Sequence, residues 1–228
     1  MTFMRSTIGL LRPSALIGLA LLAVLLPGCG SGDDDTAPSA TPSPTPAGYL
    51  GMVLEEPMPK PDFTLTDTAG DPYNFREETE GYLTYLYFGY TYCPDICPSH
   101  MADIASVMKR QPEFKEKVKV VFVTVDPDRD TPSRLRAWLD LFDTSFIGLR
   151  GDAAQVEDAT RQALGELWFP IEKSTPADGG EGYIMSHAAF VQLYTLDDVT
   201  HIVYPFGVPQ DGYEWDLTKI IKEGWTES

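Results

Sequence analysis

Two cysteines separated by three residues are the most reactive feature of the sequence. Cys93 and Cys97 lie in the segment Tyr-Cys-Pro-Asp-Ile-Cys-Pro, after an aromatic, apolar stretch and before a segment with helical spacing. A helix that begins with Cys93 near its N-cap and Pro94 at its first position places Cys97 one turn on, on the same side. The positive end of that helix stabilises thiolates. Two soft thiolates suit Cu(I), and they equally suit reversible disulfide exchange.

Other uses of the two cysteines are less well supported by the residues. A structural disulfide would close a short loop, which constrains the unfolded chain little and therefore stabilises weakly. A structural zinc site needs four protein ligands, and the sequence does not show four. A thioredoxin-fold peroxidase would need a separate peroxidatic cysteine with an activating arginine, and neither is apparent.

The sequence contains three histidines and two methionines of interest near these motifs. His187 follows a polar segment and precedes an apolar one, so it is expected at the start of a strand. His100 lies three residues after Cys97 and is expected on the surface of the helix, although it could point back towards the thiols. His201 is expected to be a strand residue without a metal role, and Met101 and Met185 are expected to fill the core.

The N-terminal residues predict an export signal and a membrane anchor. Arg5 and Arg12 precede an uncharged apolar run at residues 15–26, which is short for a membrane span and typical of a signal peptide. The run ends in Leu-Pro-Gly-Cys, which is typical of a bacterial lipobox with Cys29 as the lipidated residue. We therefore expect residues 1–28 to be a lipoprotein signal peptide and the protein to be extracytoplasmic and lipid-anchored to the bacterial cell membrane. An uncleaved helical anchor is the alternative.

Residues 29–56 are predicted to be a tether, and residues 57–228 a single folded domain. The first part of this tether is rich in proline, serine and threonine, which cannot bury a core and favour an extended, semi-rigid chain. The full chain has 34 acidic and 17 basic residues and a formal charge of −17. Such a surface repels phosphate backbones, so nucleic-acid binding is excluded, and it favours solubility or a cationic partner.

The pattern of the domain predicts an α/β fold in which the cysteines follow a central strand. A hairpin is expected over residues 61–75, and buried strands are expected over 82–89 and 118–125. The remaining predicted elements are helices at 98–110, 131–142, 153–164 and 215–223, a short strand at 146–149, and paired strands at 188–196 and 199–206. A polar, glycine-rich excursion spans 172–182. This order predicts a thioredoxin-like fold with an N-terminal β-hairpin extension.

Two motifs resemble signatures of a known family. Residues 88–98, Phe-Gly-Tyr-Thr-Tyr-Cys-Pro-Asp-Ile-Cys-Pro, resemble the Cys-x3-Cys motif of the SCO/SenC family. Residues 125–132, Val-Asp-Pro-Asp-Arg-Asp-Thr-Pro, resemble its second signature. The similarity extends from about residue 57 to the C-terminus. It implies a copper-binding metallochaperone with a thioredoxin-like fold.

The same resemblance implies specific roles and partners. Cys93, Cys97 and His187 would bind copper, as Cu(I) or Cu(II). Asp126 would lie near the metal without binding it and would orient a ligand. The copper would be delivered to the dinuclear copper site of cytochrome c oxidase, so the expected partners are its copper-bearing subunit and a copper-donor protein. The alternative is a thiol-disulfide oxidoreductase that reduces the oxidase's copper-binding cysteines with Cys93 and Cys97 as its redox dithiol. That activity would need only the two thiols.

Overall fold

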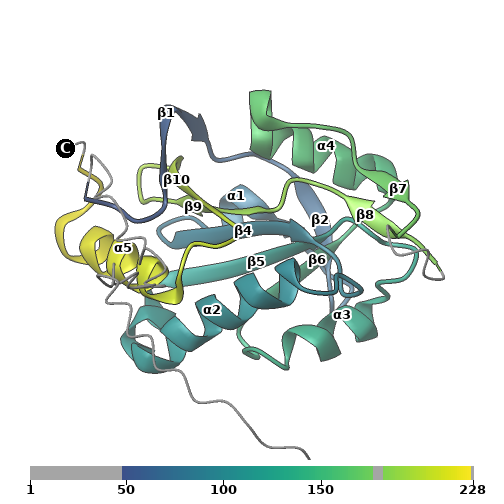
Figure 1. The fold of residues 1–228 in the computed structure, drawn as a ribbon, viewed down its shortest axis with the longest axis horizontal. Helices are drawn as coiled ribbons and strands as arrows, with labels where there is room; N and C mark the ends of the chain where they lie inside the picture. Colours follow the sequence, from purple (N-terminus) through teal and green to yellow (C-terminus); the bar gives the residue numbers. More distant parts are fainter. Residues whose placement is uncertain (1–47, 177–181, 227–228) are drawn as a thin grey trace, which may run out of the picture. The chain divides into compact units, whose positions relative to one another are not determined.

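The computed structural model describes residues 48–176 and 182–226. Its main feature is an eight-stranded mixed sheet with the order β1-β10-β9-β4-β5-β6-β2-β3 (Figure 1). In chain order these strands are β1 (Met52–Pro59), β2 (Thr64–Asp67), β3 (Pro72–Asn74), β4 (Leu83–Gly89), β5 (Val118–Thr124), β6 (Ile147–Arg150), β9 (Phe190–Tyr194) and β10 (Val199–Pro205). The predicted hairpin at 61–75 is confirmed, because β2 and β3 pair antiparallel at one edge of the sheet.

The centre of the sheet is built from the two apolar stretches that the sequence marks as buried strands. Every residue of β4 is buried, and β4 pairs in parallel with β5, which in turn pairs in parallel with β6. Strand β9 pairs antiparallel with the other side of β4. Parallel strands end at the same edge of a sheet, so the residues that follow β4 and β5 come together there.

Helices cover both faces of this sheet (Figure 1). Helices α2, α3 and α5 lie on one face, with α2 packed against α5, and α4 lies on the other. Their bounds are α1 (Phe75–Glu78), α2 (Ile96–Arg110), α3 (Pro132–Leu139), α4 (Ala153–Leu164) and α5 (Gln210–Glu223), with 3-10 turns η1 (Pro112–Glu116) and η2 (Gly165–Leu167). The bounds predicted for α4 are confirmed, and α5 begins five residues earlier than predicted.

The predicted end of the tether at residue 56 is wrong. Strand β1 begins at Met52 and pairs antiparallel with β10, and Tyr49 before it is fully buried. Gly51 lies so close to β10 that an added Cβ would stand 2.4 Å from Ile202 Cγ2. The folded domain therefore starts before residue 57. The edge strand β1 belongs to it because β1 pairs with β10, which lies far along the chain.

The predicted polar excursion contains a small structure of its own. Strands β7 (Glu172–Ser174) and β8 (Ile184–Ser186) pair antiparallel as a separate two-stranded sheet. All three residues of β7 are exposed, so this hairpin stands at the surface. It leads directly into His187 and then into β9.

Candidate functional site: a dithiol facing an imidazole

The loop between β4 and α2 brings both thiols to the edge where β4 ends. Gly89 closes the strand where no side chain fits, because an added Cβ would stand 2.7 Å from Tyr87 Cε1. Two residues later Thr91 is held by Asp130, whose carboxylate accepts from the Thr91 backbone N–H at 3.0 Å and from its hydroxyl at 2.6 Å. This anchor lies two residues before Cys93. The loop is therefore fixed close in sequence to the first thiol.

The two cysteines are free thiols with different exposure. Cys93 is half-buried, whereas Cys97 is fully buried. The expected N-cap is wrong: Asp95 caps α2, so Cys93 precedes the helix and Cys97 is its second residue. The Cys93 sulfur nevertheless accepts a hydrogen bond from the Cys97 backbone N–H at 3.3 Å. Its thiolate thus accepts hydrogen bonds from N–H groups at the helix N-terminus, as the sequence led us to expect.

This geometry makes the two thiols chemically unequal. The pKa of Cys93 is lowered to about 6. The largest cause is the hydrogen bond from the Cys97 thiol, and the backbone N–H groups at the helix start contribute to the same shift. Burial raises the pKa of Cys97 well above its ordinary value. At neutral pH, Cys93 is therefore an accessible thiolate and Cys97 a buried thiol that stabilises it.

His187 faces the buried thiol from the other side of the site. It lies between β8 and β9, and its Nε2 stands 4.0 Å from Cys97 Sγ although 90 residues separate them. Its Nδ1 lies 3.0 Å from the Ala188 carbonyl oxygen, which can only accept, so Nδ1 carries the proton. Burial lowers the pKa of His187, which keeps the imidazole neutral. The Nε2 lone pair is therefore directed at the site beside the Cys97 sulfur.

The buried Tyr87 and His100 lie next to the site, and the sequence did not single out Tyr87. The Tyr87 hydroxyl donates to Cys97 Sγ at 3.4 Å, and its ring meets the rings of both His100 and His187. The expectation that His100 lies on the surface is wrong. It is buried, and its Nδ1 stands 2.8 Å from the Tyr213 hydroxyl on α5. The helix face that carries His100 turns inward because α5 packs on it, which a local pattern does not reveal.

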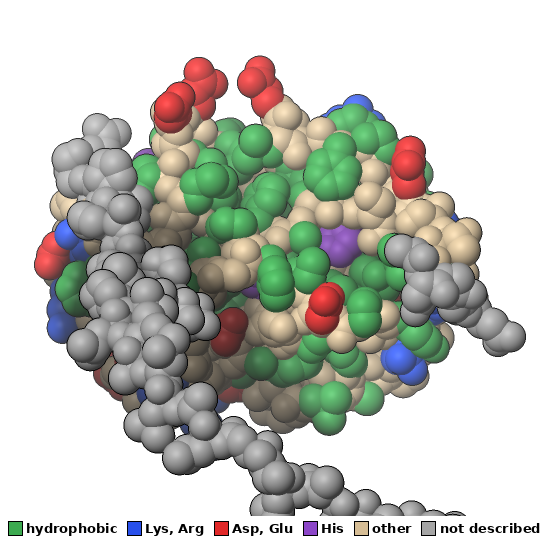
Figure 2. Space-filling view, viewed as in Figure 1, with side chains coloured by type: hydrophobic (Ala, Val, Ile, Leu, Met, Phe, Trp, Pro, Cys, Tyr) green, Lys and Arg blue, Asp and Glu red, His purple; other side chains and the backbone are tan. Residues whose placement is uncertain are grey.

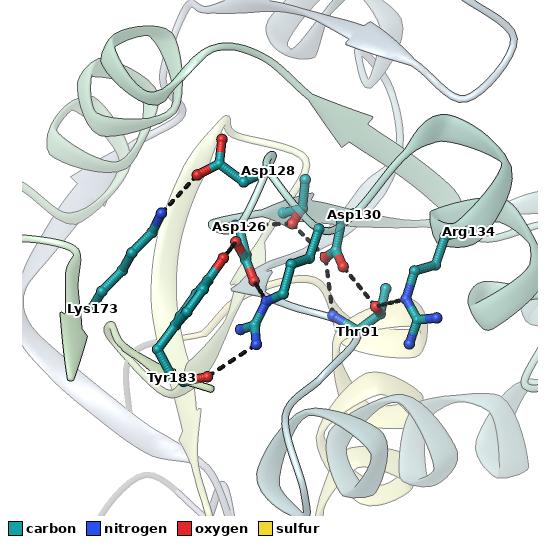
Figure 3. Close-up of polar contacts among 9 residues, drawn as sticks. Thr91, Asp126, Asp128, Asp130, Arg134, Lys173 and Tyr183 are labelled. Atoms are coloured by element: carbon teal, nitrogen blue, oxygen red, sulfur yellow. Dashed lines mark hydrogen bonds and ion pairs between the residues drawn. The ribbon is translucent and has the colours of Figure 1, made fainter. Parts of the chain in front are cut away.

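Asp126 lies at the C-terminal end of β5, as expected, and is fully buried. Its carboxylate accepts from Arg129 and from the Tyr183 hydroxyl at 2.8 Å (Figure 3). None of its hydrogen bonds within the described residues goes to the thiols or to His187. Its contact with the site runs through Tyr183, four residues before His187. The predicted second-shell role of Asp126 stays a prediction.

The remaining residues behave largely as expected. His201 is a buried residue of β10 whose Nε2 bonds Asp197 at 2.9 Å, and Met101 and Met185 belong to the core. Within residues 48–176 and 182–226, no three acidic, histidine or cysteine side chains stand close enough to form a preassembled metal cage. Cys97 contacts both Cys93 and His187, but the three residues are not a preassembled metal site, so a metal would have to draw them together.

The predicted signal peptide, the lipidation site Cys29 and the tether up to residue 47 lie outside the described residues. In the part of the chain that is described, no helix is long and apolar enough to cross a membrane.

An α/β fold with a dithiol at the start of a helix, at the end of a central strand, defines a thioredoxin-like protein. Comparison with known proteins identifies the group within this class. The family model described as SCO1/SenC matches residues 54–222. The chain belongs to the SCO1/SenC family.

Individual relatives and solved structures agree with this assignment. An SCO2-like protein of Rickettsia conorii is 31% identical over 180 residues, which cover 79% of this chain and 80% of the relative. The solution structure of apo Sco1 from Thermus thermophilus matches with a TM-score of 0.64 and 28% identity, covering 75% of this chain and 96% of that one. The structure of Bradyrhizobium japonicum ScoI with copper bound matches with a TM-score of 0.60 and 28% identity, covering 71% and 98%. These matches confirm the thioredoxin-like fold class.

Proposed function

We propose that this protein binds copper through Cys93, Cys97 and His187 and delivers it to the dinuclear copper site of cytochrome c oxidase. The observation that carries the proposal is the approach of His187 Nε2 to within 4.0 Å of Cys97 Sγ. Two sulfurs and one imidazole nitrogen are a donor set that accepts both Cu(I) and Cu(II). The copper-bound state of the B. japonicum relative supports this choice of metal.

The unequal exposure of the donors suits transfer rather than storage. Cys93 is half-buried and ionised at neutral pH, so it can take up or release copper at the surface without first losing a proton. Cys97 is fully buried, and the half-buried His187 lies beside it. Three protein ligands leave room for a ligand from a partner, so copper can pass by stepwise ligand exchange.

The surface around the thiols offers a place for such a partner. Tyr92 and Phe206 are exposed aromatic residues, one beside Cys93 and the other with its ring against His100. Hydrophobic side chains are frequent on the face shown in Figure 2, and acidic side chains lie both near its visible central histidine and at its margin. The proposed partners are the copper-bearing oxidase subunit and a copper-donor protein, which would meet a surface of mixed apolar and acidic character.

A thiol-disulfide reductase is the less favoured alternative. That activity needs the accessible Cys93 thiolate and the buried Cys97 thiol, which the site provides. It does not need an imidazole with a free lone pair beside the second sulfur. The position of His187 therefore favours metal binding.

The proposed location is outside the cytoplasm, with lipid on Cys29 and a tether that holds the domain near the membrane. The sequence support is the apolar run at 15–26 followed by the lipobox. Mass spectrometry of the membrane fraction should find diacylglycerol on Cys29, and Cys29→Ser should release the protein from the membrane. Persistent membrane association of Cys29→Ser without lipid would favour an uncleaved helical anchor.

The test of copper binding is a titration of the reduced chain from residue 48 onward. We expect one equivalent of copper, with sulfur-to-copper charge-transfer bands that Cys93→Ser and His187→Ala remove. His201→Ala is the matched control, because it deletes a buried histidine that bonds Asp197 rather than facing a thiol. Absence of stoichiometric binding, with a dithiol that still cycles against a thiol buffer, would overturn the copper proposal and favour the reductase.

A further inference from the structure

The segment that carries His187 is attached to the body of the protein in an unusual way. The β7–β8 hairpin that precedes it forms no ladder with the main sheet. A cavity of about 390 Å³ lies between them, lined by Lys173 and Met185 from the hairpin and by Asp126, Val156 and other residues from the body. Met185 of β8 packs into the core, but β7 is exposed and the hairpin shares no ladder with the main sheet. Its position must therefore depend strongly on individual side-chain contacts.

One arginine makes the central contacts. Arg129, in the turn after β5, forms an ion pair with the buried Asp126 carboxylate through its Nε. Its Nη1 donates to the Tyr183 carbonyl oxygen at 3.0 Å, one residue before β8 begins. The Tyr183 hydroxyl donates to the same Asp126 at 2.8 Å (Figure 3). Arg129 and Asp126 thus hold Tyr183 by both its main chain and its side chain.

The same guanidinium also reaches the loop that carries the first thiol. Its carbon lies 3.6 Å from the centre of the Tyr183 ring and 4.6 Å from that of Tyr92, the residue before Cys93. Cation–π contacts of this kind add to the ion pair, and Arg129 is only 22% exposed, so water screens them little. Arg129 therefore joins three segments: the turn after β5, the Cys93 loop and the strand that leads to His187.

The other ion pair of this region is weaker by comparison. Lys173 on β7 pairs with Asp128 at 2.6 Å, but these side chains are 49% and 71% exposed. Exposed ion pairs contribute little because water and salt screen them. The polar contacts to Arg129 are the more sheltered attachment of the hairpin.

We infer that Arg129, with Asp126 as its anchor, is a positioning residue that sets His187 against the thiols by clamping Tyr183 to the Cys93 loop. This inference rests on the proposed copper site. Because the three donors are not preassembled, copper affinity depends on how often His187 occupies its place before copper arrives. A looser hairpin lowers that fraction, and the apparent affinity falls in proportion.

The test compares Arg129→Met with Arg161→Met in the otherwise unmodified chain. Arg161 on α4 is a matched control, because it too pairs with a carboxylate, Glu157, and lies 4.0 Å over an aromatic ring, Trp168. We expect Arg129→Met to weaken Cu(I) binding, measured by competition with a chelator, by about 10–100-fold, the usual cost of losing a partner that orients a ligand. Arg161→Met should leave the affinity unchanged.

Two further readouts separate positioning from a general loss of stability. In the metal-free protein, amide hydrogen exchange at residues 183–189 should accelerate in Arg129→Met while β4 and β5 stay protected. In the Cu(II) protein, the nitrogen hyperfine coupling from His187 should weaken or vanish. Tyr183→Phe deletes only the hydroxyl bond to Asp126 and should shift both readouts in the same direction by a smaller amount. It also serves as the test variant should Arg129→Met fail to fold.

Unchanged copper affinity and unchanged exchange at residues 183–189 in the folded variants would overturn the inference. The exchange measurement uses metal-free protein, so it decides the clamp even where the unmodified chain binds no copper. If the proposed function is wrong, the unmodified chain will not bind copper. If the inference is wrong, the Arg129 and Arg161 variants will show the same copper affinity and the same hydrogen exchange.

Discussion

The thiol site and the contact between α5 and the segment before β1 use polar groups for opposite purposes. At the thiol site, the open end of the comparison, Cys93 is a half-buried thiolate and the His187 Nε2 lies 4.0 Å from Cys97 Sγ. At the second place, the fastened end, Asp216 on α5 accepts from the backbone N–H groups of Leu50 and Gly51, both at 2.8 Å. The first arrangement leaves electron pairs for a ligand, and the second fastens two remote segments of the chain to each other.

Aromatic stacking strengthens the fastened end. Tyr49 stacks on Trp225 with ring centres 4.7 Å apart, and His201 stacks on Trp225 at 4.2 Å. Trp225 shares the lining of one cavity with Leu83, the first residue of β4.

Removing the buried thiol should have the largest effect on the thiol site. Cys97→Ser should abolish both stoichiometric copper binding and disulfide cycling, because serine is neither a soft ligand nor a redox partner. Copper titration and a thiol-disulfide equilibrium measure the two losses. Retention of either property would mean that Cys93 acts with a partner other than Cys97.

Removing the imidazole should separate the two chemistries. His187→Ala should weaken copper binding by more than the ~100-fold that loss of an orienting partner can cost, since a ligand itself is lost. The dithiol should still oxidise. Chelator competition and the reduction potential report these effects, and an unchanged copper affinity would exclude His187 as a ligand.

The alkylation rate of the Cys93 thiolate, at the open end, should depend on pH. Because the pKa of Cys93 is lowered to about 6, its alkylation by iodoacetamide should stay near its maximum above pH 7. Below pH 6 the rate should fall about tenfold per pH unit as the thiolate is protonated. Stopped-flow alkylation of the reduced chain from residue 48 onward reports Cys93, because the buried Cys97 stays protonated. A midpoint above 8 would contradict the prediction. In Cys97→Ala the midpoint should rise, because the thiol that most lowers the pKa of Cys93 is removed.

The fastened end should affect stability alone. Asp216→Ala leaves the backbone N–H groups of Leu50, which is part-buried, and Gly51, which is buried, without their acceptor, so we expect the free energy of unfolding to fall by about 1–3 kcal/mol. Urea denaturation measures this loss, and copper affinity should not change. Asp211→Ala, an exposed position on the same helix, is the control. A drop in copper affinity in Asp216→Ala would mean that the two ends are coupled.

Local sequence patterns determined much of the fold. The apolar stretches at 82–89 and 118–125 are the two parallel central strands, and Thr131 followed by Pro132 starts α3. The bounds of α4 were also predicted, because its capping residue and helical spacing are local signals. Such features depend on a few neighbouring residues, so the sequence reveals them directly. Strand β1 was missed because its partner, β10, is remote in the chain.

For the site, the sequence by itself determined the candidates that the proposal uses: a dithiol at a helix start and a histidine after a polar segment. Only the tertiary structure decided that Cys97 is the buried thiol, that His100 points inward, and that Arg129 reaches both loops. The approach of His187 to Cys97 joins residues 90 positions apart. Contacts of that kind depend on how strands pair and helices pack across the whole domain, and no local spacing encodes them.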